Sequence, residues 1–532
     1  MNLKLDFNER ADSVPLWLQE FRPDTQCLWQ YPDRSKIEAK IAEKFNLTVE
    51  NIFLSNGGDE SIELLFKSCQ LNNQSILLSN PAFSQYTHQL SIWNIDSIVV
   101  DGLPNLAIDV DQLKKQLKAN QWLVITRPNN PTGECLSESI LLDLIKAAQN
   151  KGANIFLDEA YVEFYTENSE INYAKEFENV ISLRTFSKAF GLAGARIGYL
   201  MGNASLIAEF KKLSMPFNVN QMSLQLAQKA LDNIGEMNDY CASIAKNRDE
   251  IFTLLQSFSV DVFNGKGNFL LFRVGNKRKQ LLKSYLLKNK IQIKTQVDGL
   301  PDCVRITIPA HTEKLKKALQ TVFKPDILAF DMDGVLIDTS RSYDASIIKT
   351  VEFFTKKIIN VEEITELREK GGFNNDWDLT QKLIERNGFT VWSTNVINKF
   401  QEYYNQFKNN ETNLLNQSTA IEIFDRDGIT AIITGRPKIE ANSGVKQLNI
   451  QPNFIISADD VEQQKPSPEG INWLKTETGK NNMWFCGDTV DDMQAGTAAN
   501  CICIGIGDNA ENLYRAGADI VLNNINEIKE LL

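Results

Sequence analysis

The chain has 532 residues, 43% of them hydrophobic and 23% charged, which is typical of globular protein and too long for a single hydrophobic core. A net charge of −12 and a pI near 5.0 exclude a protein that binds nucleic acid or anionic lipid through a basic surface. No apolar run approaches the roughly 18 residues of a membrane span, and no export signal is visible, so we expect a cytoplasmic protein without a membrane partner.

Histidine and cysteine usage narrows the chemistry further. Only two histidines are present, His88 and His311, which nearly excludes Ser-His-Asp hydrolysis and histidine-rich metal sites. The eight cysteines form no Cys-x-x-Cys pair and are expected to be buried cytosolic thiols. Acid–base work therefore falls to lysine, tyrosine and carboxylate side chains.

From about residue 50 onward, strand-like apolar runs alternate with amphipathic stretches of helical length. This pattern is typical of α/β sheets with helices on both faces. The runs predicted as strands in the first part of the chain are 75–78, 122–126, 154–157 and 180–183.

A smaller region follows Gly265. Strands are predicted over 268–273 and 303–308, with a helix over 280–288 between them. The amphipathic stretch 312–323 must end before Pro325, because proline cannot continue a helix. The apolar run 327–330 then reads as a central parallel strand. We therefore expect a domain boundary at 323–326 with almost no linker.

A first set of residues fits a pyridoxal phosphate (PLP) site. Such a site needs a lysine for the Schiff base and an acid to keep the pyridine nitrogen protonated. Lys188 is the candidate lysine and would also carry the proton between substrate and cofactor. Asp158 ends the run 154–157, so its carboxylate should emerge at the carboxyl edge of a sheet, where ligands gather. Tyr161 and Asn130 can reach the hydroxyl group of the cofactor ring.

The same cofactor needs donors for its phosphate. In the segment 55–63, glycine precedes a helix, and bare backbone N–H groups at a helix start bind phosphate. This segment contributes Gly58, Asp59 and Glu60 to the expected cofactor site. Ser187 and Arg196 would complete the phosphate cup.

Residues 1–323 resemble a fold-type I aminotransferase, and most closely a histidinol-phosphate aminotransferase. The matching stretches are Tyr31-Pro32-Asp33, Gly57-Gly58-Asp59-Glu60, Pro81-Ala82-Phe83, Asn130-Pro131-Thr132-Gly133, Asp158-Glu159-Ala160-Tyr161, the Lys188 segment and Val304-Arg305-Ile306-Thr307. The resemblance implies a large domain over about 40–255 and a small domain built from the N-terminal segment and about 256–323. It also implies a homodimer with shared active sites.

The resemblance assigns substrate contacts, and the sequence departs from the family at two positions. Tyr31 is implied to reach the neighbouring subunit's site, and Arg305 to hold the carboxylate of glutamate, which becomes 2-oxoglutarate. Phe83 stands where tyrosine usually stacks on the cofactor, so the stacking remains and a hydroxyl is lost. Lys294 stands where an arginine usually grips the substrate phosphate; lysine binds phosphate without the bidentate fork.

A second set of residues fits hydrolysis of a phosphate monoester through a phosphorylated aspartate. Asp331 follows the strand 327–330 and is the candidate nucleophile, and Asp333 is the acid that protonates the leaving alcohol and later activates water. Gly334 permits the sharp turn. Carboxylate oxygens are ligands that Mg²⁺ prefers, and the ion would offset repulsion between nucleophile and phosphate.

Three later segments complete this set. Thr434 ends the predicted strand 430–433 and could donate to a phosphoryl oxygen, and Lys465 could balance negative charge. Asp488 and Asp492 follow the run 483–486 and, with Asp331 and Asp333, are the expected metal ligands.

In this order the four segments resemble the haloacid dehalogenase (HAD) superfamily, over residues 326–532. The resemblance implies a Rossmann-like core, 326–341 with 429–532, and a helical cap over about 342–428, as in its phosphatase-like subgroup. Within that insert, the cluster 371–378 is either a substrate-reading loop or a polar loop with Trp377 packed into the cap.

Together the two sets predict a bifunctional enzyme in which a phosphorylated amine made by the first is dephosphorylated by the second, as in histidine biosynthesis. The domain order then follows the reaction order. Three alternatives stay open: another phosphorylated amino alcohol as the shared metabolite, a threonine-phosphate decarboxylase-like reaction in the first domain, and a non-catalytic regulatory module in the second.

Overall fold

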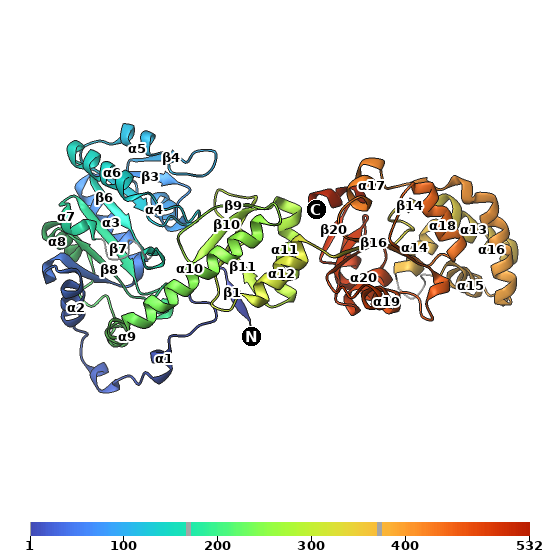
Figure 1. Cartoon of the computed structure of the whole chain (residues 1–532), viewed down its shortest axis with the longest axis horizontal. Helices are drawn as coiled ribbons and strands as arrows, with labels where there is room; N and C mark the ends of the chain where they lie inside the picture. The colour runs from blue at the N-terminus through green and yellow to red at the C-terminus, as the bar shows by residue number, and fades with distance from the viewer. Residues whose placement is uncertain (1, 166–171, 370–374) are drawn as a thin grey trace. The chain divides into compact units, whose positions relative to one another are not determined.

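The computed structural model describes residues 2–165, 172–369 and 375–532 (Figure 1). The chain forms two compact units, Met1–Lys279 with Lys290–Lys316, and Gln280–Asn289 with Lys317–Leu532. This division cuts α12 (Glu313–Phe323) and places most of α11 (Asn276–Lys288) in the second unit, where Lys288 Nζ pairs with the buried Asp519 at 2.6 Å. The boundary between the two compact units therefore differs from the boundary that the sequence predicts at 323–326.

The first unit is built on a seven-stranded sheet of order β2-β8-β7-β6-β5-β3-β4, in which β8 alone runs antiparallel to its neighbours. The strands are β2 (Ile52–Ser55), β3 (Ser75–Asn80), β4 (Ser97–Asp101), β5 (Gln121–Thr126), β6 (Asn154–Asp158), β7 (Val180–Thr185) and β8 (Gly198–Gly202). The four predicted strands of this part are thus confirmed. Thr126 pairs with Asp158, and Asp158 with Leu183, so three strands end at the same edge.

The helices of this part of the chain are α1 (Leu16–Glu20), α2 (Ser35–Phe45), α3 (Gly57–Asn72), α4 (Ser84–Ile92), α5 (Val110–Gln116), α6 (Glu138–Lys151), α7 (Tyr173–Glu176), α8 (Ala204–Leu213), α9 (Gln221–Asp232) and α10 (Ile234–Gln256). All of them except α1 bury apolar residues. In α6 the buried residues Leu141, Leu144, Ile145 and Ala148 recur at helical spacing. The Ser137 side chain accepts from Ile140 N at the start, and Gly152 ends the helix in the left-handed conformation.

The main core of the first unit lies between the sheet and helices α3, α4 and α8. Phe66 of α3, Tyr86 of α4 and Phe210 of α8 pack with the strand residues Trp122 and Phe156 in one buried cluster. Successive strand residues point to opposite faces, so the neighbours of Phe156 face away from this cluster. The sheet is therefore buried on both sides, as expected for parallel strands.

A smaller sheet carries the rest of the first unit. Its antiparallel strands have the order β12-β10-β9, and a separate parallel pair joins β1 to β11. The strands are β1 (Leu3–Leu5), β9 (Asp261–Val262), β10 (Phe269–Arg273), β11 (Ile291–Ile293) and β12 (Cys303–Thr307). Because Leu3 pairs with Ile291, the N-terminal segment is held beside this region.

The second unit is built on a parallel six-stranded sheet of order β17-β16-β13-β18-β19-β20. Its strands are β13 (Ile327–Phe330), β16 (Ile429–Ile433), β17 (Phe454–Ile456), β18 (Met483–Gly487), β19 (Ile502–Ile506) and β20 (Ile520–Leu522). Its flanking helices are α18 (Lys438–Leu448), α19 (Glu469–Thr478), α20 (Val490–Ala498) and α21 (Ala510–Ala516). The central strand β13 lies between β16 and β18, so the predicted strands before the catalytic segments are adjacent.

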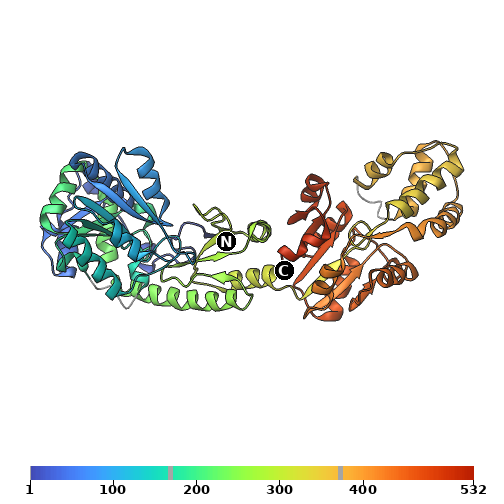
Figure 2. The same cartoon turned by 90° about the horizontal axis from the view of Figure 1, so that it is seen from above.

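Between β13 and β16 the chain forms a helical cap beside the core sheet (Figure 2). The antiparallel pair of β14 (Ile337–Asp338) and β15 (Thr412–Asn413) marks where the chain leaves the core and returns to it, and Ser340–Asp344 forms a short π-helix, η5. The cap helices are α13 (Ala345–Thr355), α14 (Val361–Glu369), α15 (Asp376–Arg386) and α16 (Ser393–Phe407), which share one buried apolar cluster. Helix α17 (Gln417–Phe424), inside the range predicted for the cap, packs instead on the core through Phe424 and Phe330.

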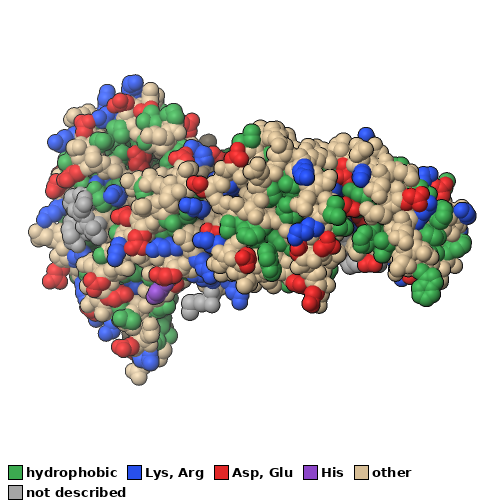
Figure 3. Space-filling view, turned by 45° about the vertical axis from the view of Figure 1, so that its right-hand side comes forward, with side chains coloured by type: hydrophobic (Ala, Val, Ile, Leu, Met, Phe, Trp, Pro, Cys, Tyr) green, Lys and Arg blue, Asp and Glu red, His purple; other side chains and the backbone are tan. Residues whose placement is uncertain are grey.

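The surface agrees with the acidic composition. On the face shown in Figure 3, lysine and arginine side chains are interspersed with aspartate and glutamate. Among the helices that the structure describes, none is both long and apolar enough to cross a membrane.

Candidate active sites

The first site is a cavity of about 310 Å³ at the carboxyl edge of the seven-stranded sheet. Most of the predicted cofactor residues line it. These are Gly58, Asp59, Phe83, Asn130, Asp158, Tyr161, Ser187, Lys188 and Arg196, together with the predicted substrate residue Arg305. The sheet edge brings them together because β5, β6 and β7 end side by side there.

Asp158 is held in this cavity by a residue that sequence reasoning did not find. Tyr86 Oη donates to Asp158 Oδ2 at 2.8 Å, and Ala160 N donates to Oδ1 at 3.0 Å. Burial raises the pKa of Asp158 to about 6, against the lowering effect of these two hydrogen bonds. A buried carboxylate without a cation is unfavourable, so this position suits the protonated nitrogen of a bound pyridine ring.

Lys188 projects into the same cavity from the loop after β7. Its Nζ donates to the carbonyl oxygen of Phe7 at 2.8 Å and lies 5.6 Å from the centre of the Tyr161 ring. Phe7 and Glu9 line the cavity as well. The N-terminal segment after β1 therefore forms part of this site, a contact between residues far apart in the sequence that no local pattern indicated.

Residues suited to a phosphate group gather where α3 begins. Arg196 Nη2 pairs with Asp59 at 2.8 Å, and Arg196 Nη1 lies 3.5 Å from Ser187 Oγ. Gly57 has a φ of +77°, and a Cβ there would lie 2.5 Å from Arg196 Nη2. Glycine thus permits both the turn and the close approach of the guanidinium to the start of the helix.

Arg305 and Asn130 occupy another wall of the cavity. Arg305 is 8% exposed, and it donates to the side-chain oxygen of Asn130 and to Asp6 O, the latter at 2.8 Å. Tyr161 Oη accepts from Asn8 Nδ2 at 3.1 Å and from Asn130 Nδ2 at 3.4 Å. This arrangement fixes a buried guanidinium where an anionic substrate group could bind.

Three predicted residues lie outside the lining of this cavity. The Glu60 carboxylate accepts from Asn218 Nδ2 at 2.7 Å and from Asn56 N, so the structure gives it no contact with the cofactor cavity. Tyr31 is 79% exposed and stacks on Phe217, with ring centres 4.2 Å apart. Lys294 Nζ lies 5.8 Å from the centre of the ring of Phe7, a residue that does line the cavity.

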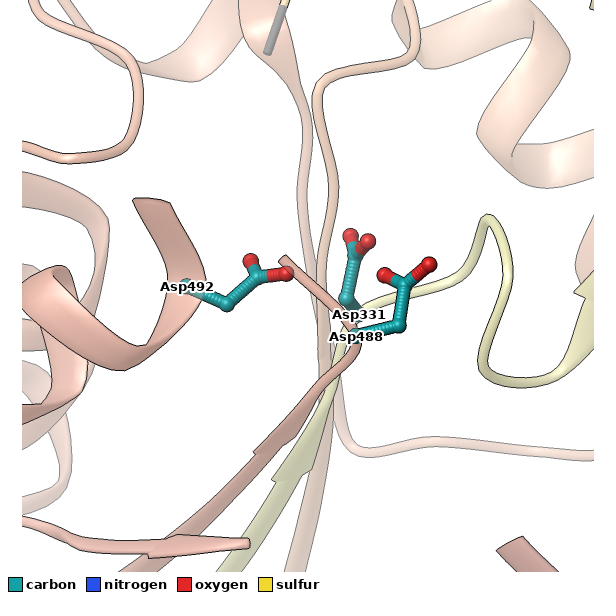
Figure 4. Close-up of side chains that lie close together, drawn as sticks. All are labelled: Asp331, Asp488 and Asp492. Carbon is teal, nitrogen blue, oxygen red and sulfur yellow. The ribbon is translucent and has the colours of Figure 1, made fainter. Parts of the chain in front are cut away.

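The second site lies at the carboxyl edge of the six-stranded sheet. Asp331, Asp488 and Asp492 each place a carboxylate oxygen within 4.8 Å of the others. Figure 4 shows Asp331 and Asp488 at the ends of neighbouring strands and Asp492 on a helix, all facing a common space. Burial, together with nearby Asp492 and Asp331, raises the pKa of Asp488 well above its ordinary value.

Lys465 contacts two of these three carboxylates. Its Nζ lies 2.7 Å from Asp331 Oδ1 and 2.6 Å from Asp492 Oδ1. Burial alone would lower the pKa of Lys465, but the two carboxylates raise it above its ordinary value. Asp492 also accepts from Thr489 Oγ1 at 2.6 Å in a capping box that starts α20, so a helix end fixes this carboxylate.

Asp333 and Thr434 lie beside this group but are held differently. Arg436, which sequence reasoning missed, places its Nη2 2.6 Å from Asp333 Oδ1 and 3.1 Å from Glu411 Oε2. The Asp333 carboxylate therefore faces Arg436 and is not part of the three-carboxylate group. Thr434 is buried, and its Oγ1 accepts from Arg436 N at 3.2 Å. Arg436 follows Thr434 by two residues in the loop after β16, a position that could have identified it.

A cavity of about 210 Å³ opens from the carboxylates toward the cap. Of the predicted cluster 371–378, residues 371–374 lie outside the described part of the chain. The described remainder contributes Asn375, Asp376 and Trp377 to the cavity lining, and Trp377 also packs against the buried cluster of the cap. Arg368 binds both Asp376, at 2.9 Å, and Asp344, at 2.8 Å.

Comparison with known proteins decides the family. A family model described as aminotransferase class I and II matches residues 3–322, more than half of the chain. The chain belongs to the class I and II aminotransferase family. The predicted resemblance and fold class of the first part are thereby confirmed, and in this aminotransferase Lys188 lines the cavity of about 310 Å³.

The second part of this aminotransferase chain matches another family. Residues 328–506 match the haloacid dehalogenase-like hydrolase model, which confirms the predicted C-terminal hydrolase domain. The chain is thus a fusion of two enzyme domains.

Individual relatives are similar to the aminotransferase part. A histidinol-phosphate aminotransferase from Chlorobium limicola is 32% identical over 288 residues, 52% of this chain and 79% of the relative. The crystal structure of histidinol-phosphate aminotransferase from Sinorhizobium meliloti in complex with pyridoxal-5'-phosphate has a TM-score of 0.54 at 21% identity, covering 60% of this chain and 90% of that one.

A third relative shows that the fold alone does not decide the reaction. The crystal structure of L-threonine-O-3-phosphate decarboxylase from Porphyromonas gingivalis has a TM-score of 0.52 at 23% identity, covering 60% of this chain and 98% of that one. A fold can host several chemistries. The family and the cavity support PLP as the cofactor, while the substrate must be argued from the site.

The residues of the second site fit a divalent cation. Asp488 Oδ1 is buried without a hydrogen-bond partner, and three carboxylates converge beside it. Such an oxygen-only group suits Mg²⁺, and a cation there would offset the burial of several negative charges.

Proposed function

We propose that this chain is a bifunctional enzyme that makes a phosphorylated amino alcohol by transamination and then removes its phosphate. The proposed substrates are imidazole-acetol phosphate and glutamate, which give histidinol phosphate and 2-oxoglutarate; hydrolysis then gives histidinol. The observation that carries the proposal is the presence of both residue sets in one chain, with a histidinol-phosphate aminotransferase as a relative of the first. Covalent linkage would raise the concentration of one site near the other.

In the first site, PLP when bound would supply an electron sink for the bonds at the amino-acid Cα. Lys188 would hold the cofactor and move the proton at that Cα. Asp158 would keep the pyridine nitrogen protonated, Arg196 and Ser187 would bind the phosphate, and Arg305 would bind the carboxylate of glutamate. Phe83, which lines the cavity, would stack on the ring.

In the second site, Asp331 would attack the phosphorus atom while Asp333 gives its proton to the leaving alcohol. The Asp333 carboxylate would then take a proton from a water molecule that attacks the phosphorylated Asp331, which releases inorganic phosphate and restores both side chains. Asp331, Asp488 and Asp492 would hold Mg²⁺, which would neutralise charge between the nucleophile and the phosphate. Lys465 would balance the remaining charge beside Asp331, and Thr434 would donate to a phosphoryl oxygen.

We also propose a cytoplasmic homodimer. Exposed apolar side chains support the dimer: Trp29 and Tyr31 are 81% and 79% exposed, Phe217 stacks on Tyr31, and Met215 is exposed as well. Tyr31 would reach the partner's active site from there. All eight cysteines are free thiols, which supports a reducing compartment.

The proposal is tested with the full chain. Incubation with imidazole-acetol phosphate, glutamate and Mg²⁺ should release both 2-oxoglutarate and inorganic phosphate. Lys188→Ala should abolish the visible absorption of the bound cofactor and the transamination while leaving hydrolysis of added histidinol phosphate. Asp331→Asn should do the reverse. Failure to turn over either substrate would refute the histidine assignment, and loss of both activities in either variant would refute independent sites.

The alternatives give different products. Lys294, in place of arginine, leaves another phosphorylated amino alcohol open, which a panel of such substrates decides. A threonine-phosphate decarboxylase-like reaction would release carbon dioxide without 2-oxoglutarate. A regulatory second domain would bind phosphate esters without Mg²⁺-dependent release of phosphate.

A further inference from the structure

The cavity above the three carboxylates of the second domain is strongly acidic. Among the residues that the structure describes, eight carboxylates and two guanidinium groups line its volume of about 210 Å³, so this described lining carries six more acids than bases. A phosphate group at the floor would lie near Lys465 and near the divalent cation that the three carboxylates would hold. The described residues of the upper part of the cavity, between the core and the cap, provide no such surplus of positive charge.

Both lining arginines are already neutralised. Arg368 contacts Asp344 and Asp376, and Arg436 contacts Asp333 and Glu411. Each guanidinium therefore lies between two carboxylates. A substrate with a second anionic group would be repelled here, whereas a cationic group would be attracted.

Glu440 is the carboxylate best placed to meet such a cation. It lies in the first turn of α18 in the core, and its oxygens accept from Gln401 Nε2 at 2.8 Å and from Tyr343 Oη. Both donors are neutral, and no lysine or arginine in the described part of the chain pairs with Glu440. Its charge is thus oriented by hydrogen bonds but not compensated.

Aromatic side chains complete this part of the cavity. Tyr343 and Phe400 are buried with ring centres 5.9 Å apart, and Trp377 of α15 lines the same cavity. Aromatic faces attract cations and stack on planar rings. The cavity therefore combines a phosphate end, an acidic wall and an aromatic wall within reach of one small molecule.

We propose that Glu440 binds the ammonium group of a phosphorylated amino alcohol, so that the hydrolase domain selects its substrate by positive charge as well as by phosphate. The inference rests on the proposed function and names the substrate class of its second half. The amino group installed by the first domain is then the feature that the second domain recognises. Tyr343 and Gln401 are positioning residues, which hold the Glu440 carboxylate toward the cavity.

The test compares two esters with the full, PLP-loaded chain and Mg²⁺: histidinol phosphate and its analogue with hydrogen in place of the amino group. We expect kcat/KM to favour the amine by about ten- to a hundredfold, the range of a charge-assisted hydrogen bond. Glu440→Gln should remove most of this preference through KM of the amine, and Glu440→Asp should restore part of it. Glu477→Gln, on an exposed residue of α19, is the matched control and should behave as wild type.

Failure of the inference about Glu440 and failure of the proposed phosphatase function give different results. A Glu440 role limited to holding the cap on the core would slow both esters equally and would refute the inference. So would a wild-type preference below about threefold, or a preference that survives in Glu440→Gln. If neither ester nor para-nitrophenyl phosphate is hydrolysed, the proposed phosphatase function itself fails.

Discussion

Replacement of Asp158 by asparagine removes the negative charge beneath the proposed cofactor and one accepted hydrogen bond. The side chain is 7% exposed, and asparagine has nearly the same shape. The carboxylate accepts from Tyr86 Oη at 2.8 Å and from Ala160 N at 3.0 Å, whereas an amide has a single oxygen and keeps only one of these two bonds. The pH dependence of the stability difference, and not its size at one pH, therefore reports the free energy of burying the charge.

The free-energy cost of burying this charge follows from the pKa of Asp158. Burial raises it from 3.8 to about 6, so the folded protein binds a proton in a range where the unfolded chain has lost it. Stability accordingly falls as the pH rises from about 4 to about 6, and it stays lower above that range. The buried charge thus lowers the free energy of unfolding by about 3 kcal/mol at pH 7.5 and by about half of that at pH 5.

The assay is urea unfolding of the cofactor-free protein at these two pH values. We expect the stability of Asp158→Asn relative to wild type to be about 1.5 kcal/mol greater at pH 7.5 than at pH 5, because the lost hydrogen bond affects both values equally. Saturation with PLP should stabilise wild type more than the variant, because only the carboxylate can pair with a protonated pyridine nitrogen. A stability difference that is the same at both pH values would refute the reasoning.

Three further substitutions test other contacts. Tyr86→Phe removes a hydrogen bond to a carboxylate and should raise the dissociation constant of PLP about tenfold, measured by absorbance titration. Arg436→Met leaves Asp333 and the buried Glu411 carboxylate unpaired and should cost about 3 kcal/mol, seen as a clear fall in the thermal midpoint; an unchanged midpoint contradicts it. Gly487→Ala should slow phosphate release about a hundredfold by displacing Asp492, with transamination as the unaffected control.

Residues at strand ends were predictable from the sequence. Asp158 and Asp331 each follow an apolar run, and parallel strands in an α/β sheet bring such positions to one edge. The order of motifs then gave the family of each part, which the comparisons confirm. The predicted domain limits and residue roles stay predictions.

Contacts across the fold were not predictable in this way. Tyr86 and Glu440 lie in short helices. From the sequence alone, Tyr86 is most simply interpreted as a packing residue and Glu440 as part of a solvent-exposed face. Strand β1 has three residues and pairs with β11 almost 300 positions away, so no local pattern announces the part of Phe7 in the first site. Glu60 lies within the segment 55–63 that is predicted to bind phosphate, yet its side chain turns toward Asn218.

Two glycines of the second site help to decide whether a related protein keeps an active hydrolase domain. A Cβ at Gly334 would lie 2.0 Å from Asp488 Oδ2, and one at Gly487 would lie 2.3 Å from Asp492 Cβ. The space that a Cβ would need at either position is thus occupied by an aspartate side chain of the site. In a related fusion gene, a larger residue at either glycine would mark a silenced hydrolase even where every aspartate is retained, so a search for lost activity should examine the glycines first.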